Sequence, residues 1–232
     1  MSIAERKFLK IGHRGAAGHE PENTLISFQR AIELGADMIE LDVQLCKSGE
    51  LVVIHDDTLE RTTNGHGRVG DKTQTELKAL DAGKGQKIST LDEVIKLVGL
   101  RTKINVELKG KGTARPLADL IYRYTGPGCG QNQFLVSSFD IDELFKFRAI
   151  DQFSRIGLIF KKLANDIFQI AEELSCYSIH PSVGLTTAEL LDEAHEMGLK
   201  VFVWTANASP DISLLKAMGV DGIFSDFPDR LI

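Results

Sequence analysis

The chain has 232 residues, of which 43% are hydrophobic and 26% charged, which excludes a disordered or a membrane-embedded protein. This length favours a single domain over residues 1–232. With 27 Lys and Arg against 33 Asp and Glu, the net charge is −6, so we expect no nucleic-acid partner. An anionic small-molecule substrate remains compatible with this charge if local cations hold it.

The cysteines and the first residues of the chain bear on the cellular compartment of the protein. Cys46, Cys129 and Cys176 are odd in number and contain no C-x-x-C pair, which argues against a disulfide framework or a structural zinc site. The first residues lack the pattern of a secretory signal, and no apolar run is long enough to span a bilayer. We therefore expect a cytoplasmic protein without stable membrane insertion.

Short β-type runs alternate with amphipathic helical stretches along the chain. The predicted strands are residues 8–12, 38–43, 103–108, 134–137, 155–159, 176–179, 200–204 and 222–224. The predicted helices are residues 24–34, 91–98, 116–124, 141–149, 163–174, 187–197 and 212–218. Strict alternation predicts a parallel sheet, and eight strands within this length favour a closed (β/α)8 TIM barrel of the α/β class.

One interval interrupts this alternation after the second predicted strand. Residues 47–54 predict a hairpin, and the Gly-, Thr- and Asn-rich stretch that follows is too long for an ordinary loop. We interpret residues 56–88 as a small cap insertion over the barrel mouth. Glycines at three helix–strand joints, Gly35, Gly198 and Gly219, predict helix ends in a left-handed conformation.

Two predicted strands carry charged side chains at alternate positions. Glu40 and Asp42 share one face of their strand, and Glu107 and Lys109 alternate with apolar residues on the next. Carboxylates inside a barrel repel each other and lose solvation, a penalty that a cation relieves. Three of them suit a hard ion such as Mg²⁺ or Ca²⁺. Either pair alone, Glu40 with Asp42 or Glu107 with Lys109, would be explained by ordinary charges on an edge strand. That explanation is weaker than a metal site when both pairs occur inside apolar runs.

Two histidines follow apolar strands, where a barrel gathers its catalytic groups. His13 and His55 have an ordinary pKa near ~6.5, so such a pair can divide the roles of general base and general acid. Arg14 can grip a phosphate bidentately. The only tryptophan, Trp204, could wall an apolar or glycerol-like group, although a core position is equally compatible. The other histidines fit a structural role: His19, His66, His180 and His195.

Seven motifs follow one another in a fixed order from about residue 11 to residue 228. They are Gly-His-Arg-Gly (12–15), Pro-Glu-Asn-Thr (21–24), Glu-Leu-Asp-Val (40–43), Val-Ile-His-Asp (53–56), Arg-Thr-Thr (61–63), Glu-Leu-Lys (107–109) and Trp-Thr-Ala-Asn (204–207). As a set they closely resemble the glycerophosphodiester phosphodiesterase family in its short bacterial form. The resemblance implies a (β/α)8 barrel that hydrolyses glycerophosphodiesters to sn-glycerol 3-phosphate and an alcohol.

The resemblance also implies a role for each site residue at its matched position. Glu40, Asp42 and Glu107 would be metal ligands, with His13 and His55 as the acid–base pair. The residues implied in substrate binding are Arg14 and Lys109 for the phosphate, and Trp204 and Phe139 for the glycerol.

Several alternatives remain open at this point. A glycosidase also uses paired carboxylates on a barrel, but the His-Arg and Glu-x-Lys pairs suit phosphate better. A lysophospholipase D, a phospholipase C-like phosphodiesterase or a non-catalytic barrel that binds a phosphate ligand could share these residues. The sequence leaves undecided the head group, the choice between Mg²⁺ and Ca²⁺, attack by water or through a cyclic phosphate, the oligomeric state and the role of the insertion.

Overall fold

The computed structural model describes residues 8–126, 132–164 and 166–231, in which strands and helices alternate as predicted. The strands are β1 (Leu9–Gly12), β2 (Met38–Leu45), β3 (Leu51–Val53), β4 (Lys103–Leu108), β5 (Phe134–Ser138), β6 (Arg155–Phe160), β7 (Ser178–Pro181), β8 (Lys200–Val203) and β9 (Gly222–Ser225). The helices are α1 (Leu25–Glu33), α2 (Gln74–Ala79), α3 (Leu91–Val98), α4 (Ala114–Thr125), α5 (Ile141–Ile150), α6 (Ile167–Glu173), α7 (Ala188–Glu196) and α8 (Ser209–Met218). Short 3₁₀ turns are η1 (Val69–Asp71), η2 (Val183–Leu185) and η3 (Pro228–Leu231).

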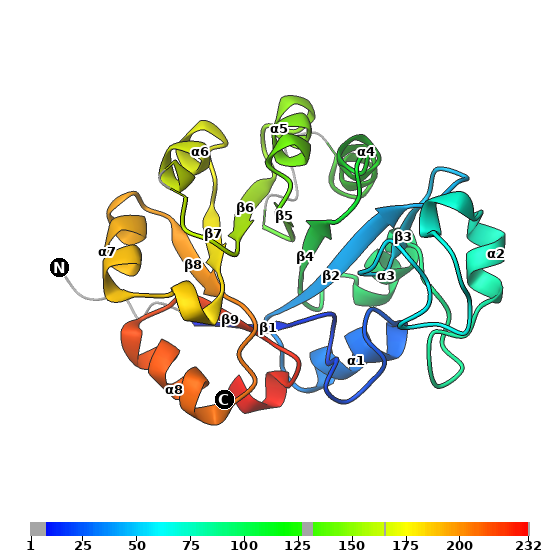
Figure 1. Cartoon of the computed structure of the whole chain (residues 1–232), viewed down its shortest axis with the longest axis horizontal. Coiled ribbons are helices and arrows are strands. Elements are labelled where there is room, and N and C mark those ends of the chain that lie inside the picture. Colours follow the sequence, from blue (N-terminus) through cyan, green and yellow to red (C-terminus); the bar gives the residue numbers. More distant parts are fainter. Residues whose placement is uncertain (1–7, 127–131, 165, 232) are drawn as a thin grey trace.

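The parallel strands close into a ring. β1 pairs in parallel with β2 on one side and with β9 on the other, and the remaining neighbours follow in the order β9-β8-β7-β6-β5-β4-β2. Among the described strands, β3 pairs with β2 alone, in antiparallel fashion, and lies outside the ring, while Val52 also forms an isolated bridge with Thr90. Figure 1 shows α1 and α4 to α8 arranged around the outside of these strands. For the described residues, the predicted (β/α)8 barrel is confirmed.

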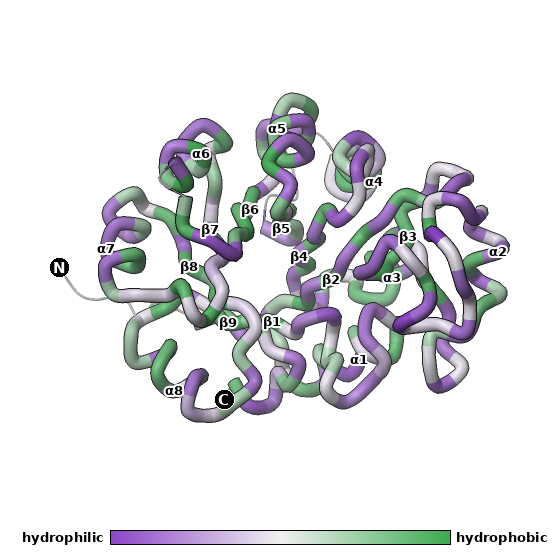
Figure 2. The backbone as a smooth tube through the Cα atoms, viewed as in Figure 1, coloured by the Kyte–Doolittle hydropathy of each residue, from purple (hydrophilic) through white to green (hydrophobic). Residues whose placement is uncertain are grey.

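Alternation along the strands separates an outer core from the barrel interior. Ile39, Leu41 and Val43 on β2 are fully buried in the large cluster of side chains that includes the helices. The residues between them point into the barrel. A separate apolar cluster, Ile11, Met38, Leu135, Phe202 and Phe224, comes from the inward-facing positions of five strands. Figure 2 shows β6 and β8 largely green, hence hydrophobic, while many connecting loops are purple or white.

Several predicted boundaries are wrong by two residues or more. α8, for example, begins at Ser209 rather than at residue 212, with Pro210 in its first turn. β7 begins at Ser178 rather than at residue 176, because the Cys176 N–H still donates to the Ala171 carbonyl at the end of α6, at 2.8 Å. α6 begins at Ile167 rather than at residue 163, since the Leu163 side chain is 54% exposed and does not belong to the buried face. The predicted left-handed glycines at the helix ends are confirmed, with φ values of +76° to +86°.

The insertion after β2 is ordered around an apolar cluster of its own. The predicted hairpin is confirmed, because β2 and β3 pair in antiparallel register with Val43 opposite Val53. The cluster joins β3 to the following segment through buried residues that include Leu59, Val69, Leu77 and Ile88. Figure 1 shows α2 beside β3, on the outer side of β2. The insertion is therefore fixed to the barrel wall next to the carboxyl end of β2.

Two of the three cysteines lie within the described residues. Cys46 and Cys176 are free cysteines, whereas Cys129 lies outside the described residues. None of the helices in the described segments is both long enough and apolar enough to cross a membrane.

Candidate active site

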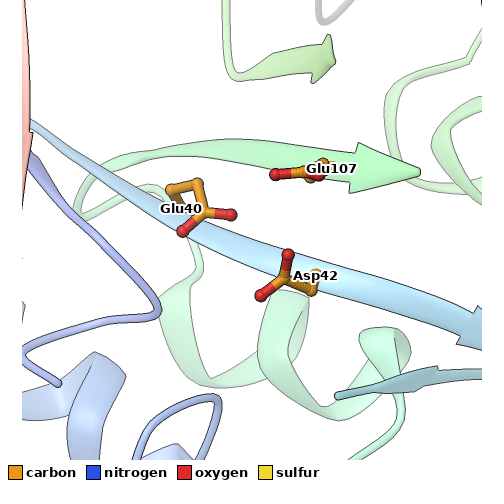
Figure 3. A group of neighbouring side chains, drawn as sticks. All are labelled: Glu40, Asp42 and Glu107. Carbon is orange, nitrogen blue, oxygen red and sulfur yellow. The ribbon is translucent and has the colours of Figure 1, made fainter. Parts of the chain in front are cut away.

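Three carboxylates meet at the carboxyl end of β2 and β4. These strands are parallel neighbours in a register that sets Asp42 opposite Glu107 and Glu40 opposite Asn105. One oxygen from each of Glu40, Asp42 and Glu107 lies within 4.8 Å of the others. Figure 3 shows the three carboxyl groups, two from β2 and one from β4, directed toward a common space. The structure thus brings together the acidic trio that strand alternation predicts.

Burial raises the free energy needed to keep these three carboxylates ionised. Glu40 and Asp42 are 2% and 1% exposed, and the Glu107 side chain is 12% exposed. Desolvation and the charge of Asp42 raise the pKa of Glu40 to about 8 and the pKa of Glu107 to about 7. The positive charges of the protein therefore do not balance the three carboxylates, and a bound cation would supply the missing positive charge.

The hydrogen bonds around the trio leave room for such a cation. The Arg14 backbone N–H donates to Glu40 Oε2 at 2.8 Å, and Asn23 Nδ2 donates to Asp42 Oδ2 at 2.9 Å. Lys109 Nζ donates to Glu107 Oε1 at 2.9 Å. In contrast, Glu40 Oε1 is buried without a hydrogen-bond partner among the described residues. An all-oxygen donor set with an unsatisfied buried carboxylate oxygen fits a hard divalent ion.

His13 follows β1 and is oriented by a carboxylate from the far end of the chain. Its Nδ1 lies 2.7 Å from Asp226 Oδ1, and Asn207 Nδ2 donates to Asp226 Oδ2 at 2.6 Å. An ionised Asp226 accepts a hydrogen bond, so His13 carries a proton on Nδ1 and presents Nε2 to the cavity. Burial lowers the pKa of His13, but the Asp226 hydrogen bond and the charge of Glu40 outweigh it, so that the pKa is raised.

His55 follows β3 and has a matching partner. Its Nδ1 lies 2.6 Å from Asp56 Oδ1. Desolvation lowers the pKa of His55 and outweighs the opposing effects of Asp42 and Asp56. The environments of the two imidazoles therefore shift their pKa values in opposite directions, which is the usual basis for separate acid and base roles.

Two cations contact the acidic trio, Lys109 at Glu107 and Arg14 at Asp42. Arg14 adopts the left-handed conformation with φ +51°, and its Nη1 donates to Glu22 Oε1 at 2.7 Å. Its Nε lies 3.3 Å from Asp42 Oδ2, an ion-pair contact without hydrogen-bond geometry. A side chain at Gly15, with φ +85°, would collide with Ser27, so glycine is needed where the chain turns back toward β2.

Most of these groups line one cavity of about 300 Å³, whereas Asp42, which is 1% exposed, lies behind its lining. Trp204 and Phe139 form one wall, with their rings edge to face and their centroids 5.4 Å apart, and Trp204 Nε1 donates to the His180 carbonyl at 2.8 Å. The predicted site residues that line the cavity are His13, Arg14, Glu40, His55, Glu107, Lys109, Phe139 and Trp204. The further lining residues are Asn105, Ile159, Lys161, His180, Thr205 and Phe224.

No role was predicted from the sequence for several residues that form hydrogen bonds with the predicted site residues. Asp226 and Asp56 orient the histidines, and Glu22 and Asn23 hold Arg14 and Asp42. Asp226 directly follows the last strand, a position at the carboxyl rim that could have signalled it. Among the histidines given a structural role, His180 is fully buried yet lines the cavity, and desolvation lowers its pKa to about 3.

Comparisons with known proteins agree with this geometry. Residues 13–230 match the Glycerophosphoryl diester phosphodiesterase family. The chain is similar to a glycerophosphodiester phosphodiesterase of Caldanaerobacter subterraneus subsp. tengcongensis, with 39% identity over 97% of both chains, and to one of Bacillus altitudinis, with 35% identity over 96% of both. Among solved structures, it is similar to an Oleispira antarctica phosphodiesterase in complex with the product sn-glycerol-3-phosphate, with a TM-score of 0.88 and 30% identity over 95% of this chain and 94% of that one. The chain therefore belongs to the glycerophosphoryl diester phosphodiesterase family.

Proposed function

We propose that this protein hydrolyses glycerophosphodiesters to sn-glycerol 3-phosphate and an alcohol, using a divalent ion held by Glu40, Asp42 and Glu107. The observation that carries the proposal is the buried carboxylate trio, of which Glu40 and Glu107 line one cavity together with two oriented histidines. The product complex of the similar Oleispira antarctica phosphodiesterase supports the substrate class.

The ion is proposed to be Mg²⁺ or Ca²⁺, because both prefer oxygen ligands and keep positions open for substrate oxygens. When bound, it would supply positive charge that neutralises a nonbridging phosphate oxygen. Arg14 and Lys109 would hold the remaining phosphate charge, since both line the cavity next to the carboxylates.

The opposite pKa shifts of the two histidines support a division of their roles. His55, whose pKa is lowered, would accept the proton of the attacking hydroxyl at Nε2. His13, whose pKa is raised, would donate a proton from Nε2 to the departing alcohol oxygen. Each histidine is kept in the required tautomer by its carboxylate partner on Nδ1.

The cavity favours a polar diester over the acylated alternatives. Most of its lining residues have charged or hydrogen-bonding side chains, and the apolar ones are Phe139, Ile159, Trp204 and Phe224. A lysophospholipase D or a phospholipase C-like enzyme would need an apolar path for acyl chains. Phe139 and Trp204 instead suit a wall for the glycerol. The cytoplasmic location and the single domain over residues 1–232 stay predictions.

The proposal is tested by release of glycerol 3-phosphate. The protein is stripped of metal with a chelator and incubated with glycerophosphocholine or glycerophosphoethanolamine, with and without added Mg²⁺ or Ca²⁺. We expect release only when a divalent ion is returned. Release at the full rate from the stripped protein would contradict the metal assignment, and no release from either diester under any condition would contradict the activity.

A further inference from the structure

One arginine of the insertion bridges two carboxylates that contact residues of the proposed site. Arg61 lies in the segment 56–88, and it is not among the described residues that line the cavity. Its Nε donates to Asp56 Oδ2 at 2.6 Å, and its Nη1 donates to Glu22 Oε2 at 2.7 Å. Its Nη2 reaches both carboxylates, at 3.2 Å from Asp56 Oδ1 and 2.8 Å from Glu22 Oε1. All three guanidinium nitrogens are thus used to bridge two acids.

Each of these acids holds a residue of the proposed site. Asp56 Oδ1 lies 2.6 Å from His55 Nδ1, and Glu22 Oε1 accepts from Arg14 Nη1 at 2.7 Å. The guanidinium of Arg61 therefore joins the proposed base to the proposed phosphate ligand by two hydrogen-bonded steps on either side. A planar fork can bridge two carboxylates in fixed geometry, which a lysine ammonium cannot do.

The backbone that carries Arg61 is itself fixed by the insertion. Leu59 is fully buried in the small apolar cluster next to β3. The Thr63 backbone N–H and hydroxyl donate to the Leu59 carbonyl at 3.1 and 2.7 Å, and the Leu59 N–H donates to the Gly67 carbonyl at 3.1 Å. This turn fixes the chain on both sides of Arg61.

We propose that Arg61 is a positioning residue, through which the insertion orients His55 and Arg14 for catalysis. The inference rests on the proposed function, because it assigns a role within that reaction. Arg61 is 47% exposed, and exposed ion pairs contribute little to stability. Its role is therefore to orient the site. This gives the segment 56–88 a part in catalysis.

The test compares steady-state kinetics of glycerophosphocholine hydrolysis in Arg61→Ala, Arg61→Lys and the matched control Arg68→Ala. Arg68 lies in the same insertion and contacts Asp57 at 3.3 Å, on a side chain that is 66% exposed. We expect kcat to fall about 10- to 100-fold in both Arg61 variants, the range typical of residues that orient ligands or catalytic groups. KM should change less than kcat, because Lys109, Phe139 and Trp204 still bind the substrate.

Two further measurements separate orientation from other roles. If Arg61 acts through Asp56, the double variant Arg61→Ala/Asp56→Asn should be within about threefold of the slower single variant. Thermal unfolding should show midpoints for the Arg61 variants close to that of Arg68→Ala. A fully active Arg61→Lys would mean that only charge matters and would overturn the inference, as would kcat of Arg61→Ala within about threefold of wild type.

The wild-type protein and Arg68→Ala show whether a negative result concerns the proposed function or only the role of Arg61. If neither releases glycerol 3-phosphate, the proposed function fails, and the inference fails with it. If both are active and Arg61→Ala matches them, only the inference fails. Should Arg61→Ala not unfold cooperatively, Arg61→Lys decides the question alone, because it keeps the charge and loses the fork.

Discussion

The hydrogen bonds around Asp226 predict that its replacement by asparagine reverses the tautomer of His13. Asn207 Oδ1 already accepts from the Ser225 hydroxyl at 3.0 Å and from the Asp226 backbone N–H at 2.9 Å. The backbone N–H can only donate, so the amide of Asn207 must keep its Nδ2 directed at the side chain of residue 226. An asparagine introduced there would turn its oxygen toward Asn207 and its NH₂ toward His13 Nδ1. His13 would then hold its proton on Nε2.

The size of the effect follows from charge and orientation together. At an effective dielectric constant of about 20, opposite charges ~4 Å apart attract by about 4 kcal/mol, equivalent to about 3 pKa units. The side chains of His13 and Asp226 are 20% and 27% exposed, so this is an upper bound on the fall in the His13 pKa. Loss of a working general acid lowers rates by about 10²- to 10⁴-fold. We expect kcat of Asp226→Asn to fall within this range.

The assay measures kcat and the thermal midpoint for Asp226→Asn and for the exchanged pair Asp226→Asn/Asn207→Asp. In the double variant, a carboxylate at position 207 accepts from the introduced amide, which can then turn its oxygen back to His13 Nδ1. We expect kcat of the double variant to be about tenfold or more higher than that of the single variant. This is a smaller change than most of the roughly 10²- to 10⁴-fold effect of a general acid, because the carboxylate now lies farther from His13. Wild-type kcat in Asp226→Asn, or no recovery in a folded double variant, would refute the tautomer argument.

The remaining predictions concern stability, substrate binding and proton transfer. Because Glu40 and Glu107 have raised folded-state pKa values of about 8 and about 7, the folded protein without metal binds more protons than the unfolded chain above the ordinary glutamate pKa of 4.5. Its thermal midpoint should therefore fall as the pH rises from about 5 to about 8, and a midpoint that rises would contradict this. Added Mg²⁺ or Ca²⁺ should restore more stability at pH ~8 than at pH ~5. Trp204→Ala should raise KM for glycerophosphocholine about tenfold with a smaller change in kcat, and the reverse pattern would remove Trp204 from the glycerol wall. His55→Ala should lower kcat about 10²- to 10⁴-fold with metal affinity retained in a titration; an unchanged kcat would exclude His55 as the base.

Local sequence patterns were enough to predict the strands and the acidic trio. The period of two along residues 38–43 and 103–108 sets Glu40, Asp42 and Glu107 opposite the apolar face, and parallel pairing of β2 with β4 then brings them together. The family resemblance supplied the substrate class and the aromatic wall. Because the three carboxylates lie on the neighbouring strands β2 and β4, their proximity required only the right order of strands.

The contacts of Asp226 and Arg61 could not be predicted from periodicity, because they depend on closure of the barrel and on the path of the insertion. Asp226 and His13 are 213 positions apart, and they meet because β9 pairs with β1 at the seam of the ring. Arg61 reaches Glu22, 39 positions away, from an insertion whose path depends on its small apolar cluster. Periodicity describes which face of an element is buried, and it carries no information on which charged side chains meet at the rim.

The most direct test of the central claim is a calorimetric titration of the metal-free protein with Mg²⁺ and with Ca²⁺. Wild-type protein should bind one ion per chain, and Glu107→Gln should bind at least tenfold more weakly, because one of three carboxylate ligands is lost. The exposed-site control Glu33→Gln should bind like wild type. Wild-type affinity in Glu107→Gln, or full turnover of a glycerophosphodiester by protein that binds no ion, would contradict the account.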